Sequence, residues 1–202
     1  MRLIFVDTET SGLNPLEHTV LEIALVLWDL KSGEMIDSYE SVVAIERVQF
    51  RKAQPEALKC NGFTFDELRE KGKPMAEIKM EILAFFSRNG VNRTNSKFIA
   101  QNCSFDKSFF THILTEDEQR QANLPYHWLD FPSMNFVVCL QNLREASKDS
   151  GKSSTTMNYM SIPFSKDYIA SANSLPPEEK PHRAMNGVKH LILLFKNIVG
   201  RG

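Results

Sequence analysis

The chain has few cysteines, no excess of one charge and no long apolar run. Only three of its 202 residues are cysteine. They lie far apart without metal-site spacing, so we expect reduced thiols and a cytoplasmic location. Basic and acidic side chains nearly cancel, giving a net charge of −1, so no overall basic field predicts a nucleic-acid partner. No apolar stretch approaches the length of a membrane span, and no membrane partner is expected.

The beginning of the chain and its length indicate the domain organisation. The first apolar run, residues 3–6, is too short for the core of a signal peptide. With 42 % hydrophobic residues, the chain is long enough to bury a sizeable core. No internal repeat or linker divides it. We therefore predict one domain over residues 1–202.

The order of apolar and polar residues predicts an α/β protein with a mixed sheet flanked by helices. An antiparallel meander of three strands is expected at residues 3–6, 20–29 and 35–45, with a turn at 31–34. Two further strands are expected at residues 97–100 and within 128–140. Helices are expected at residues 55–58, 64–68, 75–86, 105–114 and 184–199. Residues 148–156 and 173–181 have the composition of loops.

The first strand ends in two acidic residues, Asp7 and Glu9, which the turn residues Thr10, Ser11 and Gly12 follow. Side chains alternate across a strand, so these carboxylates leave the same face about 7 Å apart. Like charges at a buried strand end repel each other unless a cation lies between them, which favours a divalent metal. By itself, Asp-x-Glu is more often a solvated strand end.

Two more elements carry residues suited to chemistry. Asp106 follows the strand at 97–100 and lies where a helix begins, at the kind of strand end where sites collect. Alone, it is better explained as a first-turn acid that complements the helix dipole. His182 opens the last helix, and a single histidine there is more often a surface residue or a cap.

The three elements together resemble the motifs of the DEDDh exonuclease family, which includes the proofreading subunit of bacterial DNA polymerase III, ribonuclease T and oligoribonuclease. The matching segments are Asp-Thr-Glu-Thr-Ser-Gly-Leu from residue 7, Asn-x-x-Phe-Asp from Asn102, His-Arg-Ala from His182, and Asn-Gly-Phe-Thr from residue 61. The resemblance implies a ribonuclease-H-like fold. It also implies removal of nucleoside 5′-monophosphates from a 3′ end with two Mg²⁺ or Mn²⁺ ions, which stabilise the attacking and leaving oxygens.

The resemblance assigns roles to single residues. Asp7, Glu9 and Asp106 would bind metal, and His182 would act as general base near pH 7. The backbone around Thr10 would hold the terminal 3′-hydroxyl, while Leu13 would wedge against the last base. An ordinary turn residue on the core is an equal alternative for Leu13. Further substrate-binding candidates are Phe63, Asn102 and Arg183; a core position for Phe63 and a solvent-facing Arg183 are the alternatives.

The chain departs from the family at the fourth metal ligand, five residues after the histidine, where Gly187 stands. No acid occurs from Pro181 to Gly202, and Glu178 and Glu179 are the nearest replacements. Gly187 either serves close helix packing or marks a lost ligand. The missing carboxylate predicts weak binding of at least one metal ion. The leading hypothesis is thus a 3′→5′ exonuclease, weakened by this change. The alternative is an exonuclease-fold protein that binds single-stranded nucleic acid or a partner without efficient turnover.

Single-stranded 3′ ends of DNA or RNA are the expected partners. The sequence does not separate DNA from RNA, since that depends on contacts at the sugar 2′ position. A polymerase or a second copy of the chain is a further candidate partner.

Overall fold

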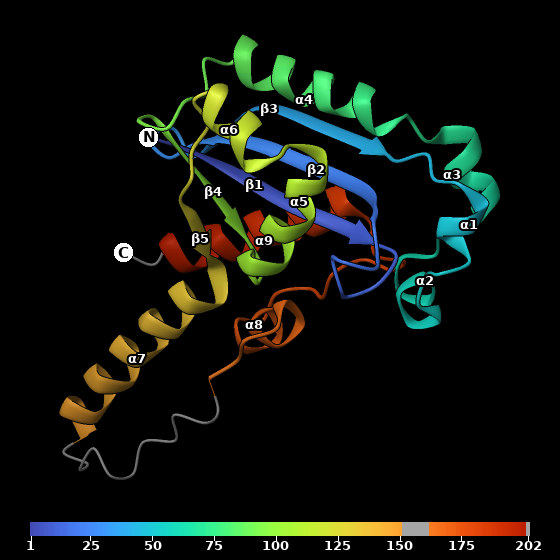
Figure 1. Cartoon of the computed structure of the whole chain (residues 1–202). Helices are drawn as coiled ribbons and strands as arrows, with labels where there is room; N and C mark the ends of the chain where they lie inside the picture. Colours follow the sequence, from blue (N-terminus) through green and yellow to red (C-terminus); the bar gives the residue numbers. More distant parts are fainter. Residues whose placement is uncertain (151–161, 201–202) are drawn as a thin grey trace.

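A five-stranded sheet forms the centre of the protein (Figure 1). The computed structural model describes residues 1–150 and 162–200. The strands are β1 (Arg2–Thr10), β2 (Val20–Asp29), β3 (Glu34–Val42), β4 (Ser96–Ala100) and β5 (Trp128–Asp130), in the order β3-β2-β1-β4-β5. The first three strands pair antiparallel, while β4 and β5 pair parallel to β1 and β4. The predicted mixed sheet with its opening meander is therefore confirmed.

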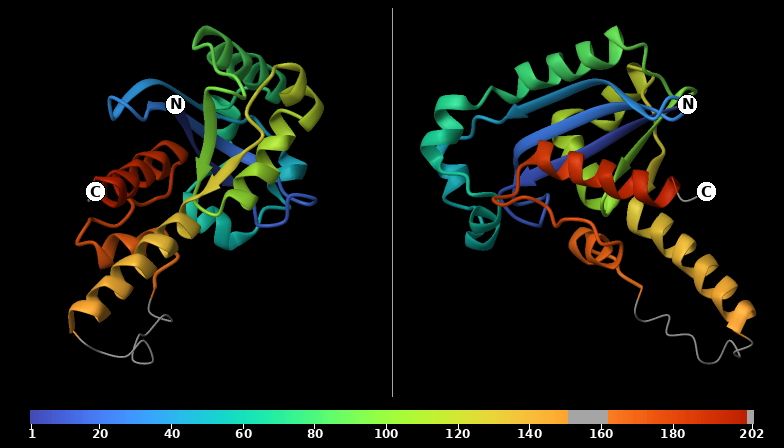
Figure 2. Two further views of the ribbon diagram at one scale, coloured as in Figure 1. Left: turned by 90° about the vertical axis from the view of Figure 1, so that its left-hand side faces the viewer. Right: turned by 180° about the vertical axis from the view of Figure 1, so that it is seen from behind.

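Helices cover both faces of the sheet (Figure 2). One face packs against α4 (Met75–Arg88) and α5 (Cys103–Ile113), and the other packs against α8 (Lys166–Ala172) and α9 (Ala184–Val199). The remaining helices are α1 (Arg47–Phe50), α2 (Pro55–Asn61), α3 (Phe65–Lys71), α6 (Glu116–Gln121) and α7 (Phe131–Ser150). No helix in the described part of the chain is long and apolar enough to cross a membrane.

The period of two in β1 directs its side chains into two separate cores. Ile4 and Val6 belong to the core under α4 and α5, whereas Leu3 and Phe5 belong to the core under α9. The same alternation continues past the apolar run, so Asp7 leaves the sheet toward α9 and Thr8 toward α5. The end of β1 therefore presents polar side chains to both helix layers.

Three expected strands differ from the structure. The first runs from Arg2 to Thr10 instead of over residues 3–6, so Thr10 belongs to β1 and not to the turn. The third strand ends at Val42 rather than residue 45. Within residues 128–140 only Trp128–Asp130 is strand, because α7 begins at Phe131. The Asp130 carboxylate accepts a hydrogen bond from the Ser133 backbone N–H at 3.2 Å, and Pro132 occupies the first turn, where no N–H is needed. Pro132 therefore lies in the first turn of a helix rather than within the expected strand.

The two expected loops had different outcomes. Residues 173–181 contain no helix or strand, as predicted. Of the predicted loop at residues 148–156, residues 148–150 belong to α7, and residues 151–156 lie outside the part that the structure describes. Helices α1, α6, α7 and α8 were not expected.

The start of α9 is held by a side chain from the sheet. The Ala184 backbone N–H donates a hydrogen bond of 2.7 Å to Glu22 Oε2. Replacing Glu22 by alanine removes this acceptor and is expected to lower the free energy of unfolding by about 1 kcal/mol. Glu22→Gln keeps an acceptor and is expected to be nearly neutral. Urea unfolding of both variants checks this, and equal losses would contradict a capping role.

Candidate active site

The acidic end of β1 is buried rather than solvated. Asp7 is 9 % exposed, and Glu9 is half-buried. Burial raises the pKa of Asp7, and burial together with the charge of Asp7 raises the pKa of Glu9 to about 8. Carboxylates in such surroundings would be stabilised by a nearby cation. The divalent ion expected at this strand end stays a prediction.

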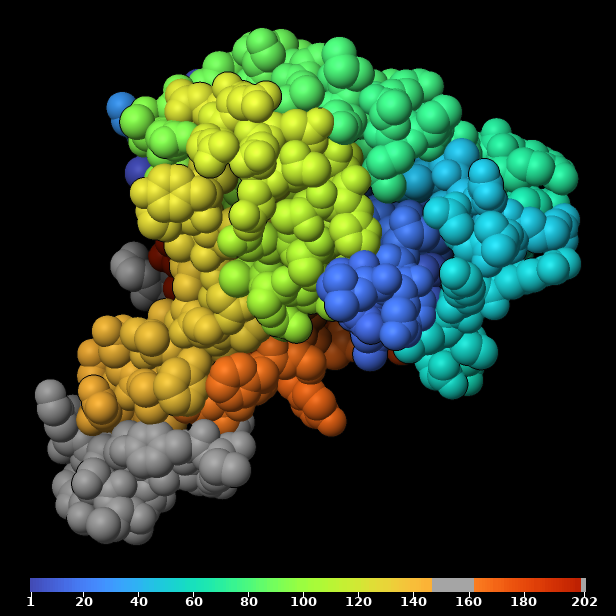
Figure 3. All heavy atoms as spheres, in the orientation of Figure 1, coloured from blue at the N-terminus to red at the C-terminus, as the bar shows by residue number. Residues whose placement is uncertain are grey.

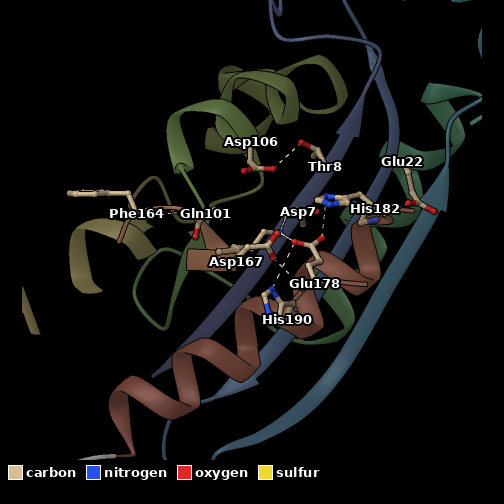
Figure 4. Close-up of polar contacts among 12 residues, drawn as sticks. Asp7, Thr8, Glu22, Gln101, Asp106, Phe164, Asp167, Glu178, His182 and His190 are labelled. Carbon is tan, nitrogen blue, oxygen red and sulfur yellow. Dashed lines mark hydrogen bonds and ion pairs between the residues drawn. The ribbon is translucent and has the colours of Figure 1, made fainter. Parts of the chain in front are cut away.

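Asp106 reaches the same region from α5 (Figure 4). It is 3 % exposed, and Thr8 Oγ1 donates a hydrogen bond of 2.8 Å to its Oδ1. Burial and the negative charge of Asp7 hold the pKa of Asp106 well above its usual range. The charge of Asp7 therefore acts on both Glu9 and Asp106, although 97 residues or more separate Asp106 from the other two in the sequence.

His182 lies just before α9, and its backbone N–H donates a hydrogen bond of 3.0 Å to the carbonyl of Cys60. Its side chain is 27 % exposed, which leaves the ring accessible from solvent. Nδ1 lies 3.6 Å from Glu178 Oε1, and Figure 4 shows this pair beside Asp7. The structure therefore brings the predicted base to the predicted acids.

Two charged residues complete the site. Glu178, whose side chain is 1 % exposed, lies in the loop before α9, and Lys166 begins α8. The Lys166 ammonium lies 3.1 Å from Asp7 Oδ1 and 2.8 Å from Glu178 Oε2. The sequence marked Glu178 as a nearby replacement acid. It gave no signal for Lys166, because α8 itself was not expected.

Gly187 faces Asp7 directly. A Cβ atom at position 187 would lie 2.2 Å from Asp7 Oδ2 and 2.6 Å from its Cγ. The Asp7 carboxylate therefore fills the space in which a side chain at this position would begin. Of the two explanations for Gly187, close packing is realised here, and it excludes a fourth ligand from that position unless Asp7 moves.

A pocket of about 280 Å³ adjoins Glu9. Thr10, Leu13 and Phe105 line it, together with residues of α2. Leu13 is 72 % exposed, so it does not lie on the core and remains available to a base. In Figure 3 the loop after β1, in blue, reaches the surface between α5 and α2.

The other three substrate candidates are differently placed. Phe63 is 3 % exposed within the core, and the Arg183 guanidinium lies 3.9 Å from its ring centroid. Phe63 therefore offers no open face to a base, and its core alternative describes it. Arg183 also pairs with Glu67 at 3.0 Å and is no solvent-facing residue. Asn102 is exposed and begins α5 in the left-handed region with φ 56°, without a side-chain capping bond.

The fold and these motifs can be compared with known proteins. The RNase_T exonuclease family model matches residues 4–195, nearly the whole chain. The chain belongs to the RNase_T exonuclease family. The predicted family is therefore confirmed. No curated protein is similar enough in sequence to count as a relative of this RNase_T member.

Solved structures with this RNase_T fold include exonuclease I from two sources. Escherichia coli exonuclease I in its zinc-bound complex with single-stranded DNA is 18 % identical, with a TM-score of 0.71 over 99 % of this chain and 40 % of that one. Its complex with a dT13 oligonucleotide is 20 % identical, with a TM-score of 0.71 over 96 % and 40 %. Exonuclease I from Methylocaldum szegediense is 21 % identical, with a TM-score of 0.70 over 99 % and 40 %.

These similarities confirm the ribonuclease-H-like exonuclease fold. The chain spans about 40 % of the length of those exonuclease I chains.

The donor set can be tested against a divalent cation. Buried carboxylate oxygens are the ligands that Mg²⁺ and Mn²⁺ prefer, so Asp7, Glu9 and Asp106 fit in chemistry. Among residues 1–150 and 162–200, however, no three Asp, Glu, His or Cys side chains are grouped closely enough to hold a metal ion. The acids suit a cation in kind, and the cation nearest to them here is Lys166.

Proposed function

We propose that the chain is a metal-dependent 3′→5′ exonuclease that releases nucleoside 5′-monophosphates from single-stranded nucleic acid. The observation that carries this proposal is the gathering of Asp7, Glu9, Asp106 and His182 at one end of the sheet, in a member of an exonuclease family. The oligonucleotide complexes of similarly folded exonuclease I support a single-stranded substrate.

Each of the proposed active-site residues has a separate role. Asp7, Glu9 and Asp106 would hold the divalent ions, which lower the pKa of the attacking water and neutralise charge on the phosphate when bound. His182, accessible and held by its backbone bond to Cys60, accepts the proton of that water. Thr10 and the exposed Leu13 would hold the terminal nucleoside in the adjoining pocket.

A second function is favoured by a separate observation. Asp7 packs against Gly187 and pairs with Lys166, so the acid expected to bind metal already has other partners. This arrangement supports the alternative of a protein that binds single-stranded nucleic acid or a partner without efficient turnover. Association with a polymerase or a second copy, a single domain and a cytoplasmic location stay predictions.

The proposal is tested on 5′-labelled single-stranded DNA and RNA with Mn²⁺, with Mg²⁺ and with a chelator. We expect stepwise shortening from the 3′ end, nucleoside 5′-monophosphate products and no reaction with the chelator. An oligonucleotide whose 3′-hydroxyl is blocked should resist shortening, and comparison of DNA with RNA identifies the preferred sugar. Oligonucleotide binding without any shortening would instead support the second function.

A further inference from the structure

A cation that belongs to the chain lies inside the carboxylate site. The Lys166 side chain is 14 % exposed and lies between two acids. Their side chains are buried still more deeply, with exposed fractions of 12 % for Asp7 and 1 % for Glu178. Its ammonium contacts one oxygen of each, at 3.1 and 2.8 Å. The two carboxylates compensate the charge of this buried ammonium, so Lys166 is part of the site and not an exposed surface lysine.

The surrounding structure fixes this lysine. Lys166 is the first residue of α8, whose N-terminus is capped by Ser165, since the Ser165 side chain accepts a hydrogen bond from the Tyr168 backbone N–H. Ile169 and Ala170 of the same helix lie in the core against α9. The ammonium is therefore held at the acids by a packed helix.

Glu178 depends on this lysine for most of its charge compensation. Its oxygens lie farther from the two neighbouring histidines, 3.6 Å from His182 and 3.9 Å from His190, than from Lys166. The contact with Lys166 is an ion pair rather than a well-aligned hydrogen bond. A carboxylate buried this deeply would be strongly destabilised without a cation beside it.

We propose that the Lys166 ammonium is the resident cation of this site and competes with a divalent ion for Asp7. The proposal rests on the proposed metal site, and it adds a residue that sets metal affinity. Lys166 contacts Oδ1 of Asp7, one of the proposed metal ligands. The position of the family's fourth ligand holds Gly187, so the site has one carboxylate fewer and one positive charge more. Metal binding must then displace the lysine and overcome its repulsion.

The test is calorimetric titration of Mn²⁺ into wild type and Lys166→Met, without nucleic acid. Methionine is unbranched, only slightly shorter than lysine and uncharged, so we expect Mn²⁺ affinity to rise about tenfold or more. Lys79→Met is the matched control, because Lys79 forms an ion pair with Glu118 on α6, away from the site. Its Mn²⁺ affinity is expected to equal that of wild type.

Thermal unfolding without metal provides a second measurement. Lys166→Met is expected to lower the melting temperature, and adding Glu178→Gln should restore part of the loss, because the unpaired charge is removed. If Lys166→Met does not fold, Lys166→Gln, which retains a polar end, takes its place in both measurements.

The outcomes separate this inference from the proposed function. Tighter Mn²⁺ binding by Lys166→Met supports the inference even if wild type releases no nucleotides. Unchanged Mn²⁺ affinity overturns the inference even if wild type is an active exonuclease. Absence of Mn²⁺ binding in both proteins overturns it too, as does weaker oligonucleotide binding with unchanged Mn²⁺ affinity, which would make Lys166 a phosphate ligand.

Discussion

Asp106→Asn is expected to reduce nucleotide release about a thousandfold while raising the melting temperature of the metal-free protein. Asparagine has the same shape and keeps an oxygen for the hydrogen bond from Thr8, so the fold should be retained. It removes one of the proposed metal-binding charges, which accounts for the loss of activity. Burial and repulsion from Asp7 raise the pKa of Asp106 and so disfavour its ionised form in the folded state. Asparagine carries no charge, so it avoids both costs.

The two effects require two measurements on the same preparation. Nucleotide release is followed on a 5′-labelled single strand with Mn²⁺, and melting is followed with a chelator present. Asp66→Asn is the control, since Asp66 is exposed and pairs with Arg69 on the surface of α3. It should leave both quantities unchanged. Full activity in Asp106→Asn would mean that Asp106 is not an active-site residue. A lower melting temperature would contradict the inference that its buried charge destabilises the metal-free protein.

The catalytic candidates were predicted by resemblance to the motifs of a family, and each motif begins or ends a local sequence pattern. Asp7 and Glu9 follow an apolar run on β1, and Asp106 follows the next strand parallel to it. Period-two alternation predicted only that Asp7 and Glu9 leave one face of β1. The structure shows that Asp7 faces α9, where the last motif also lies. The resemblance was needed to assign the roles of these residues. The sheet supplies the geometry, because it brings the ends of its parallel strands to one edge.

Lys166 could not be predicted for the opposite reason. Its partner Asp7 is 159 residues away, and the contact depends on α8, whose seven residues are too few to show a helical period. The choice between a base-stacking and a core position for Phe63 could not be made from the sequence either. An aromatic residue after a turn gives no indication of whether its ring is buried. Both depend on tertiary packing, which local patterns do not contain.

Gly187→Ala is expected to lower the free energy of unfolding by about 2 kcal/mol. Alanine within a helix normally stabilises it by about 1 kcal/mol relative to glycine, so the expected sign is unusual. The reason is the Asp7 carboxylate, whose Oδ2 would lie 2.2 Å from the new Cβ atom. Asp7 must turn away, which overpacks the site and breaks its hydrogen bond with Lys166.

The same substitution should change sign when Asp7 is already alanine. Asp7→Ala removes the three atoms nearest the new Cβ, so Gly187→Ala is then expected to stabilise the protein by up to about 1 kcal/mol. Urea unfolding of the four proteins in this cycle, without metal, measures both values. Asn186→Ala in the two backgrounds is the control, because its side chain pairs with Glu179 outside the site.

The sign of this cycle decides what Gly187 does. Destabilisation that depends on Asp7 means that Gly187 leaves room for the Asp7 carboxylate. An aspartate at position 187 would then displace Asp7, a proposed metal ligand, instead of adding one. Stabilisation in both backgrounds would mean that Asp7 yields easily. The space for a fourth carboxylate would then be present, and its absence would weaken metal binding by charge alone.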